Sequence, residues 1–258
     1  MKVISLVNQK GGVAKTTTAA ALADYFARQG KKTLLIDFDP QGSLTTSFGH
    51  ADDVDNPQAL KFLALEKGIV EPEPVVLANN LHLLMSDMGL EQANIKLVTK
   101  LGKERYLRRA IDKITQKENY DFVILDSNPS FSQLTMNVLY ASDHVLVPFK
   151  PEYNSFKGTI QLFENIEEMK CIQPNLSVLG FVVTMARNTK SAKEAITAIK
   201  QFAEKQNCKV FSPAIRLAVA AADAPSHGKS LHSYSPSSDV AKDYEQLAAA
   251  VLAVLGEI

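Results

Sequence analysis

The chain has 258 residues, of which 46% are hydrophobic and 22% are charged, and its formal net charge is zero. This balance is typical of one globular domain with a sizeable core, and it excludes a fibrous or intrinsically disordered protein. No apolar run approaches the roughly 18 residues that a membrane-spanning helix needs. The two cysteines, Cys171 and Cys208, have no partner motif. We therefore expect a cytoplasmic protein without a signal peptide.

Charge is distributed unevenly along the chain. Residues 187–229 contain eight Lys/Arg against three Asp/Glu, and residues 96–117 contain eight against two. Residues 51–79 are acidic, with six Asp/Glu against two Lys/Arg. Nucleic-acid binding cannot be argued from the overall charge, but local basic faces are compatible with it.

Apolar, strand-like runs alternate with helical patterns along the chain. The predicted strands are Val3–Asn8, Thr33–Asp37, Leu81–Met85, Phe122–Asp126, His144–Pro148 and Val178–Thr184. The predicted helices are Thr16–Gln29, Glu104–Gln116, Gln133–Ala141, Phe156–Met169, Ala192–Gln206 and Val240–Leu255. Continuously apolar strands are typical of a parallel sheet buried on both faces. We predict one α/β domain over residues 1–258, with a doubly wound, mostly parallel sheet flanked by helices on both faces.

A glycine-rich loop follows the first predicted strand and precedes the first predicted helix. In such a loop the backbone N–H groups turn toward a phosphate, and the helix N-terminus adds its dipole. Lys15 is predicted to reach the β- and γ-phosphates, and the Thr16 hydroxyl is predicted to bind Mg²⁺. The predicted nucleotide contacts are Lys10, Gly11, Gly12, Val13, Ala14, Lys15, Thr16 and Thr17.

This loop departs from the general P-loop consensus, which places glycine where this chain has Gln9 and Ala14. It resembles the deviant Walker A loop of the ParA/MinD family, which usually reads KGGVGKTT against KGGVAKTT here. The resemblance implies a P-loop NTPase fold and an ATPase with ATP and Mg²⁺ as cofactors. If position 14 requires a positive φ, alanine there costs about 1 kcal/mol of local strain.

Carboxylates follow two of the predicted strands. Asp37 and Asp39 lie two residues apart, on the same face of the chain, in a segment that resembles the family signature DxDPQG. The resemblance assigns Asp39 to orienting the attacking water and Asp37 to supporting the metal and phosphate region. Asp126 ends a buried strand, which is the Walker B arrangement, and is predicted to hold Mg²⁺. Phosphoryl transfer depends mainly on such positioning and charge stabilisation.

Lys10 is a second lysine in the same loop. In the family that the loop resembles, this lysine reaches across a two-fold interface to the partner's phosphates, so that ATP is sandwiched between two subunits. The resemblance therefore implies a catalytic role for Lys10, comparable to that of an arginine finger, and a homodimer that forms with ATP. The alternative is a lysine that stays on the surface of its own subunit.

Two segments of the carboxy-terminal third add candidates. Met185 ends a strand–threonine–methionine segment that resembles the place where the family's adenine packs. Residues 224–229 resemble the EAPSHGK segment of ParA proteins, near which basic residues bind DNA without sequence preference. The family often has an arginine where this chain has Ala220. The candidate DNA contacts are Arg216, Lys229, Lys193 and Lys200.

The resemblance implies a slow, partner-stimulated ATPase switch that positions or partitions a cargo. The cargo could be a plasmid, a chromosome origin or a protein assembly, and the partner a ParB-like or adaptor protein. We expect the ATP dimer to bind nucleoid DNA. A MinD-like membrane-bound selector is one alternative, but Val240–Leu255 has Asp243 and Glu245 on its polar face, where interfacial helices prefer basic residues. A P-loop ATPase linked to a small molecule is another.

Overall fold

The computed structural model describes residues 1–51, 63, 65 and 73–257. Its centre is an eight-stranded sheet with the order β3-β4-β2-β5-β1-β6-β7-β8. Neighbouring strands are parallel except for β3 and β4, which are antiparallel. The strands are β1 (Lys2–Leu6), β2 (Thr33–Phe38), β3 (Val75–Ala78), β4 (Leu81–Leu84), β5 (Phe122–Ser127), β6 (His144–Phe149), β7 (Ser177–Val183) and β8 (Val210–Phe211).

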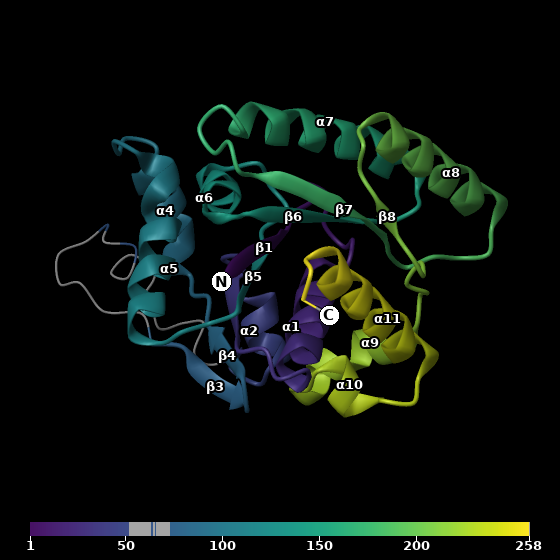
Figure 1. Ribbon diagram of the computed structural model, residues 1–258, viewed down its shortest axis with the longest axis horizontal. Helices are drawn as coiled ribbons and strands as arrows, with labels where there is room; N and C mark the ends of the chain where they lie inside the picture. Colours follow the sequence, from purple (N-terminus) through teal and green to yellow (C-terminus); the bar gives the residue numbers. More distant parts are fainter. Residues whose placement is uncertain (52–62, 64, 66–72, 258) are drawn as a thin grey trace.

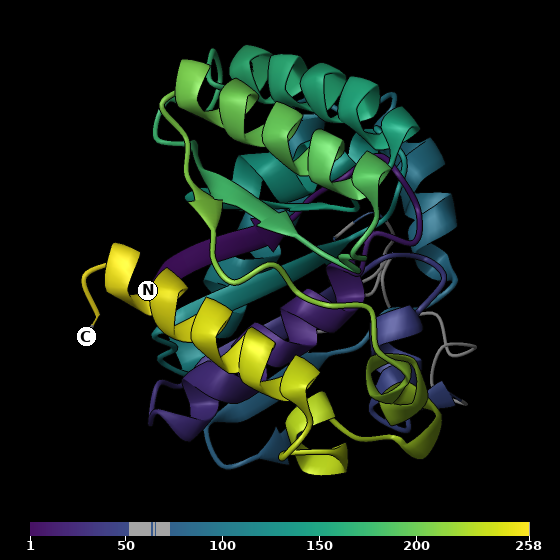
Figure 2. The ribbon, with the colours of Figure 1, turned by 90° about the vertical axis from the view of Figure 1, so that its right-hand side faces the viewer.

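Helices cover both faces of this sheet (Figures 1 and 2). One face carries α1 (Lys15–Arg28), α2 (Ser43–Ser47), α9 (Val219–Asp223), the 3₁₀ helix η3 (Ala224–His227), α10 (Leu231–Tyr234) and α11 (Asp239–Val254). The other carries α4 (Gly89–Leu97), η2 (Lys103–Arg105), α5 (Tyr106–Lys117), α6 (Gln133–Ala141), α7 (Tyr153–Met169) and α8 (Lys190–Lys205). Figure 2 shows α11 lying along α1, with α7 and α8 on the opposite side of the sheet.

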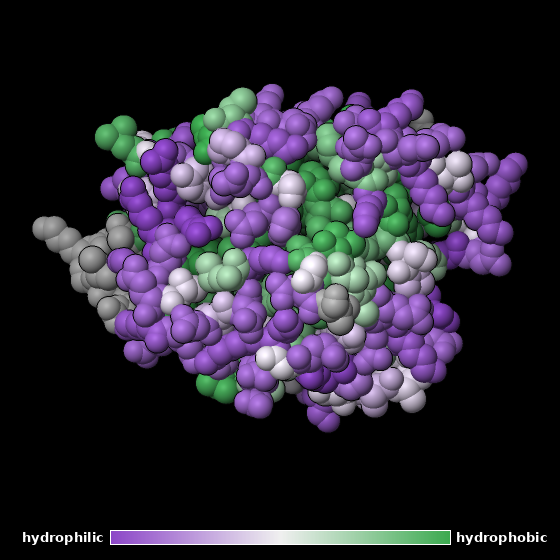
Figure 3. Space-filling model, in the orientation of Figure 1, coloured by the Kyte–Doolittle hydropathy of each residue, from purple (hydrophilic) through white to green (hydrophobic). Residues whose placement is uncertain are grey.

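Successive strand residues point into two different cores. In β2, Leu34 and Ile36 pack under α4 to α8, whereas Leu35 packs under α1 and α11. All three side chains are fully buried. This alternation explains why the central strands are mostly apolar, because helices cover both faces of the sheet there. Hydrophilic residues dominate the surface in view, and its apolar residues gather between the upper helices and the lower ones (Figure 3).

The predicted doubly wound fold is confirmed. All six predicted strands are present with bounds that differ by at most two residues, and the largest change is at β1, which ends at Leu6. The start of the predicted helix at Glu104 lies in the 3₁₀ turn η2, and α7 begins at Tyr153, three residues before its predicted start. The sequence did not predict β3, β8, α2, α4, α9, η3 and α10, most of which are short. No helix in the described ranges is long and apolar enough to cross a membrane.

Candidate nucleotide-binding site

The glycine-rich loop lies between β1 and α1, and the ends of two neighbouring strands hold it. Asn8 is buried and donates from Nδ2 to the Pro148 carbonyl in β6 at 2.6 Å, while its Oδ1 accepts from the Lys10 N–H at 2.9 Å. Thr184, directly after β7, donates its hydroxyl to the Val13 carbonyl at 3.0 Å. Sequence reasoning gave neither Asn8 nor Thr184 this role. A polar residue directly after a buried strand was the available signal.

Ala14 adopts the left-handed conformation, with φ 61° and ψ 34°, immediately before α1. Its carbonyl accepts from both the N–H and the hydroxyl of Thr18, at 3.0 and 2.6 Å, so the helix itself begins in a regular way. Position 14 therefore meets the condition under which alanine was expected to be strained. A left-handed alanine is less favourable than glycine because its Cβ crowds the following carbonyl.

We expect Ala14→Gly to raise the free energy of unfolding by about 1 kcal/mol, because glycine adopts this conformation without steric cost. Urea unfolding of the nucleotide-free chain measures it. Ala198→Gly, inside α8, is the matched control and should lower stability by about 1 kcal/mol. A loss of stability in Ala14→Gly would contradict the strain at this position.

Lys15 and three carboxylates converge beyond the carboxyl ends of β2 and β5. The strand register places Asp37 opposite Asp126, so their side chains are neighbours. Lys15 is only 7% exposed. Burial lowers the pKa of its ammonium, while the negative charges of Asp126 and Asp39 oppose that shift. The arrangement places one buried cation beside several acids, as a site for a triphosphate and its metal requires.

Asp126 is completely buried, and neither of its carboxylate oxygens accepts a hydrogen bond from the described part of the chain. Burial, and then the neighbouring Asp37, raises the pKa of Asp126 to about 8, while the Thr16 hydroxyl and Lys15 partly oppose this. Two unused oxygens beside a threonine hydroxyl fit Mg²⁺, which binds oxygen ligands and retains several waters. The predicted metal residues Thr16 and Asp126 therefore lie together.

Asp37 is held differently from Asp126. Its Oδ2 accepts from both the N–H and the hydroxyl of Thr45, each at 2.8 Å, and its Oδ1 accepts from the Asp39 N–H at 3.3 Å. Burial raises the pKa of Asp37 to about 6, and the bonds from Thr45 limit the rise. Asp37 thus organises the chain that follows β2, whereas Asp126 has free coordination capacity.

Asp39 is half-buried at the start of the turn that leads to α2. Its Oδ1 accepts from the Gln41 N–H at 3.0 Å. This bond closes a local turn of the kind that aspartate commonly stabilises. The side chain lies close enough to Lys15 to influence its pKa, so Asp39 belongs to the same site.

Lys10 points toward α7 of its own chain. Its Nζ lies 2.6 Å from Glu152 Oε2 and 2.9 Å from Ser155 Oγ. Glu152 also pairs with Lys150 at 2.6 Å, and hydrogen bonds from the two lysines, Lys10 first, lower the pKa of Glu152 to about 2. Lys10 and Glu152 are both partly exposed, which makes their ion pair easy to exchange for another partner.

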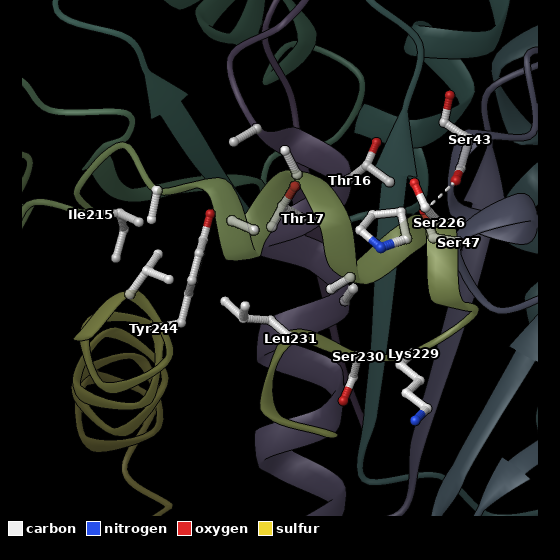
Figure 4. Close-up of a pocket in the computed structure, with 18 of the residues that line it drawn as sticks. Thr16, Thr17, Ser43, Ser47, Ile215, Ser226, Lys229, Ser230, Leu231 and Tyr244 are labelled. Atoms are coloured by element: carbon white, nitrogen blue, oxygen red, sulfur yellow. Dashed lines mark hydrogen bonds between the residues drawn. The ribbon is translucent and has the colours of Figure 1, made fainter. Parts of the chain in front are cut away.

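A cavity of about 640 Å³ opens beside the glycine-rich loop, which is within the usual size range of small-ligand sites. Figure 4 shows Thr16 and Thr17 at one end, Ile215 and Tyr244 on one side, and Ser43 and Ser226 on the other. Met185, the predicted adenine contact, also lines this cavity and has a positive φ of 50°. Met185 therefore lines the same cavity as the threonines that follow Lys15.

The segment that resembles the ParA carboxy-terminal motif packs against α2. A Cβ added at Gly228 would lie 3.3 Å from the Gly49 Cα, so the two backbones approach closely. Gly228 has φ 61° and Gly49 has φ 86°, values that favour glycine. The turn before Lys229 thus contacts the chain that leads from Asp39 through α2.

The four candidate DNA residues do not form one cluster. Arg216 makes a bidentate pair with Asp243 at 2.7 and 2.9 Å and also contacts Asp239 at 3.0 Å. These carboxylates raise the pKa of Arg216 further and neutralise its charge locally. Lys229 is exposed next to η3. The other two lysines are exposed on α8, which covers the opposite face of the sheet: Lys193 and Lys200.

Together, the parallel sheet, the loop with its two lysines and the carboxylates beyond β2 and β5 define a P-loop NTPase of the deviant Walker A type. A family model described as an AAA domain matches residues 1–178. The chromosome-partitioning ATPase Soj of Thermus thermophilus is 38% identical over 255 residues, which cover 98% of this chain and 96% of the relative. The chain belongs to the family of Soj and ParA partitioning ATPases.

Solved structures agree with this assignment. Cobyrinic acid a,c-diamide synthase from Mycobacterium smegmatis, with a bound ATP analog and magnesium, has a TM-score of 0.82 and 31% identity, covering 99% of this chain and 96% of its own. McdA from Cyanothece in complex with ATP also has a TM-score of 0.82, with 27% identity and the same coverages. The resemblance seen in the sequence is thereby confirmed. The chain is an ATPase that uses ATP and Mg²⁺.

Proposed function

We propose that this chain is an ATP-dependent dimerisation switch that positions or partitions a cargo in the cytoplasm, on the nucleoid. The cargo is a plasmid, a chromosome origin or a protein assembly. The observation that carries the proposal is the pair of lysines on one loop. Lys15 faces Asp126 and Asp39, whereas Lys10 is directed away from them and held by a partly exposed glutamate. A lysine so placed can leave its own subunit's surface and meet the phosphates of a second copy.

Within one subunit, the residues divide the work as follows. The N–H groups of residues 11–17 and the Lys15 ammonium hold the phosphates. Thr16 and Asp126 are the groups that hold Mg²⁺, which supplies charge neutralisation to the transferred phosphoryl group. Asp39 orients the attacking water, Asp37 supports the metal and phosphate region, and the adenine lies near Met185 in the cavity.

Lys10 of the partner completes the site. Its charge adds to that of Lys15 on the γ-phosphate, so the dimer is favoured while ATP is present and is weakened after hydrolysis. Size-exclusion chromatography with light scattering, in ATP and in ADP, tests this directly. A chain that stays monomeric at saturating ATP would exclude the switch.

The ATP dimer is proposed to bind DNA without sequence preference through Lys229 and the α8 residues Lys193 and Lys200, with Arg216 as a further candidate. We expect ATP-loaded protein to be retained on nonspecific DNA and to be released as salt rises. Lys229→Ala should reduce the slope of log K against log salt by about 1. Lys170→Ala, at the end of α7, is the matched control and should leave the slope unchanged.

An ATPase linked to a small molecule is a second candidate, because the cavity of about 640 Å³ is large enough for a ligand besides a nucleotide base. The similarity to cobyrinic acid a,c-diamide synthase also supports this second candidate. The rate of ATP hydrolysis separates the two candidates. The switch predicts stimulation by DNA together with a ParB-like or adaptor protein, whereas the alternative predicts stimulation by a small-molecule substrate alone.

A further inference from the structure

A buried serine beyond β4 is bonded to the catalytic turn after β2. Ser86 is 2% exposed and lies two residues beyond β4, the strand that pairs with β2. Its hydroxyl donates to the Asp39 carbonyl, and its N–H donates to the Thr45 hydroxyl at 2.9 Å. Ser86 therefore joins the end of β4 to the backbone of Asp39 and to Thr45 in α2.

Thr45 extends this connection to Asp37. Thr45 is fully buried, and its hydroxyl donates to Asp37 Oδ2 while it accepts from the Ser86 N–H. The hydroxyl thus donates one hydrogen bond and accepts another, and the two bonds fix its orientation. The result is a chain of hydrogen bonds from the Asp39 carbonyl through Ser86 and Thr45 to the Asp37 carboxylate.

These hydrogen bonds hold the backbone of Asp39 at both its N–H and its carbonyl. The Asp39 N–H donates to Asp37 Oδ1 at 3.3 Å, and the Asp39 carbonyl accepts from Ser86. Among the described residues, the Asp39 side chain itself bonds locally, to the N–H of Gln41. Its position relative to the phosphates therefore depends on how the backbone is held. A displacement of about 1 Å in a positioning group can cost as much as about 10²-fold in rate.

We propose that Ser86 is a positioning residue for ATP hydrolysis, which acts by holding the backbone of Asp39, and that Thr45 links it to Asp37. The proposal rests on the role proposed above for Asp39. Ser86 touches neither nucleotide nor metal in this scheme, so its loss acts on the turn rather than on binding. If Ser86 had a purely structural role, its loss would lower stability without a specific effect on kcat.

The test compares Ser86→Ala with wild type in three measurements: kcat at saturating Mg-ATP, the Kd of Mg-ATP, and hydrogen exchange of peptides over residues 38–47 without nucleotide. We expect kcat to fall about 10-fold while the Kd changes less than about 2-fold, which is the mark of an interaction that matters in the transition state. Exchange over 38–47 should accelerate, and exchange over α6 should not change.

Two further variants separate positioning from folding. Thr45→Val removes the hydroxyl and should reproduce the loss of kcat, whereas Thr45→Ser keeps it and should restore most of the rate. If Ser86→Ala does not fold, Ser86→Cys retains a weak donor and should show the same direction of change. Ser142→Ala is the control, because this fully buried hydroxyl also donates to a backbone carbonyl, that of Val138 at 2.6 Å, far from the site.

Asp39→Ala distinguishes the two levels of the proposal. If Asp39→Ala hydrolyses ATP as wild type does, the role of Asp39 itself is wrong. If Asp39→Ala loses hydrolysis but Ser86→Ala keeps kcat within about 2-fold, the positioning role of Ser86 is wrong. The same holds if Ser86→Ala loses activity only in proportion to lost Mg-ATP binding.

Discussion

Lys10→Ala is expected to remain monomeric at ATP concentrations that dimerise the wild type. The variant keeps Lys15, Thr16 and Asp126, so it should still bind Mg-ATP with an affinity within a few-fold of wild type. Hydrolysis should fall by about 10²-fold or more, because the charge that a second subunit would supply is absent. Light scattering, nucleotide titration and phosphate release measure the three quantities.

Glu152→Gln is the matched control for this result. It removes the carboxylate that holds Lys10 at 2.6 Å in the same subunit but keeps Lys10 itself. Because exposed ion pairs are weak, the variant should still dimerise with ATP, at a protein concentration equal to or lower than wild type requires. Dimerisation of Lys10→Ala at wild-type concentrations would show that Lys10 only serves its own surface, and the switch would lose its basis.

Much of the fold could be predicted from the sequence, because local patterns encode it. Leu34, Leu35 and Ile36 are apolar in succession, which is typical of a strand buried on both faces. The glycines and Lys15 of the loop have a fixed spacing, directly between a strand and a helix. The strand β8 could not be predicted, because two residues carry too little periodicity to be distinguished from loop. The strand β3 is as long as β4 but lacks its continuous burial, and it was not predicted either.

The candidate site was predicted less completely, because its supporting contacts join distant parts of the chain. Ser86 reaches Asp39 across 47 positions, and Thr184 reaches Val13 across 171. A serine or threonine after a strand has no sequence feature that names its partner. The sequence also does not predict the pairing of Lys10 with Glu152, because Glu152 precedes α7 and is brought to Lys10 only by the fold.

Arg216 shows how tertiary structure can change the meaning of a charge. As a basic residue in a basic stretch, it was a candidate for DNA. In the fold, α11 supplies Asp239 and Asp243, which bind all three nitrogens of its guanidinium. Arg216 therefore primarily holds the segment after β8 against α11. Lys229, Lys193 and Lys200 remain exposed and carry more of the electrostatic argument.

Asp126→Asn is expected to stabilise the nucleotide-free chain at pH 8 while it strongly slows Mg²⁺-dependent hydrolysis. The folded state raises the pKa of Asp126 to about 8, against about 3.9 in the unfolded chain. A group whose folded pKa is raised binds more protons in the folded state. The contribution of Asp126 to wild-type stability is therefore highest below about pH 4, and it falls as the pH rises toward 8.

Asparagine has no such charge, so the advantage of Asp126→Asn should grow from nearly zero at pH 4 to on the order of 2 kcal/mol at pH 8. Urea unfolding at pH 4 and pH 8 without nucleotide measures it. Asp37→Asn is the matched control. It should not share the gain, because the carboxylate of Asp37 accepts three hydrogen bonds that an amide cannot all accept.

Added Mg-ATP should reverse the order of the two proteins. Wild type is stabilised by binding Mg-ATP, and the gain increases with the logarithm of the ligand concentration over its Kd. Asp126→Asn lacks the carboxylate that holds the metal, so it binds Mg-ATP more weakly and gains less. Its hydrolysis should fall by about 10²-fold or more. If Asp126→Asn were less stable than wild type at pH 8 without nucleotide, a protein group would have to be satisfying this carboxylate. The assignment of its two unused oxygens to Mg²⁺ would then fail.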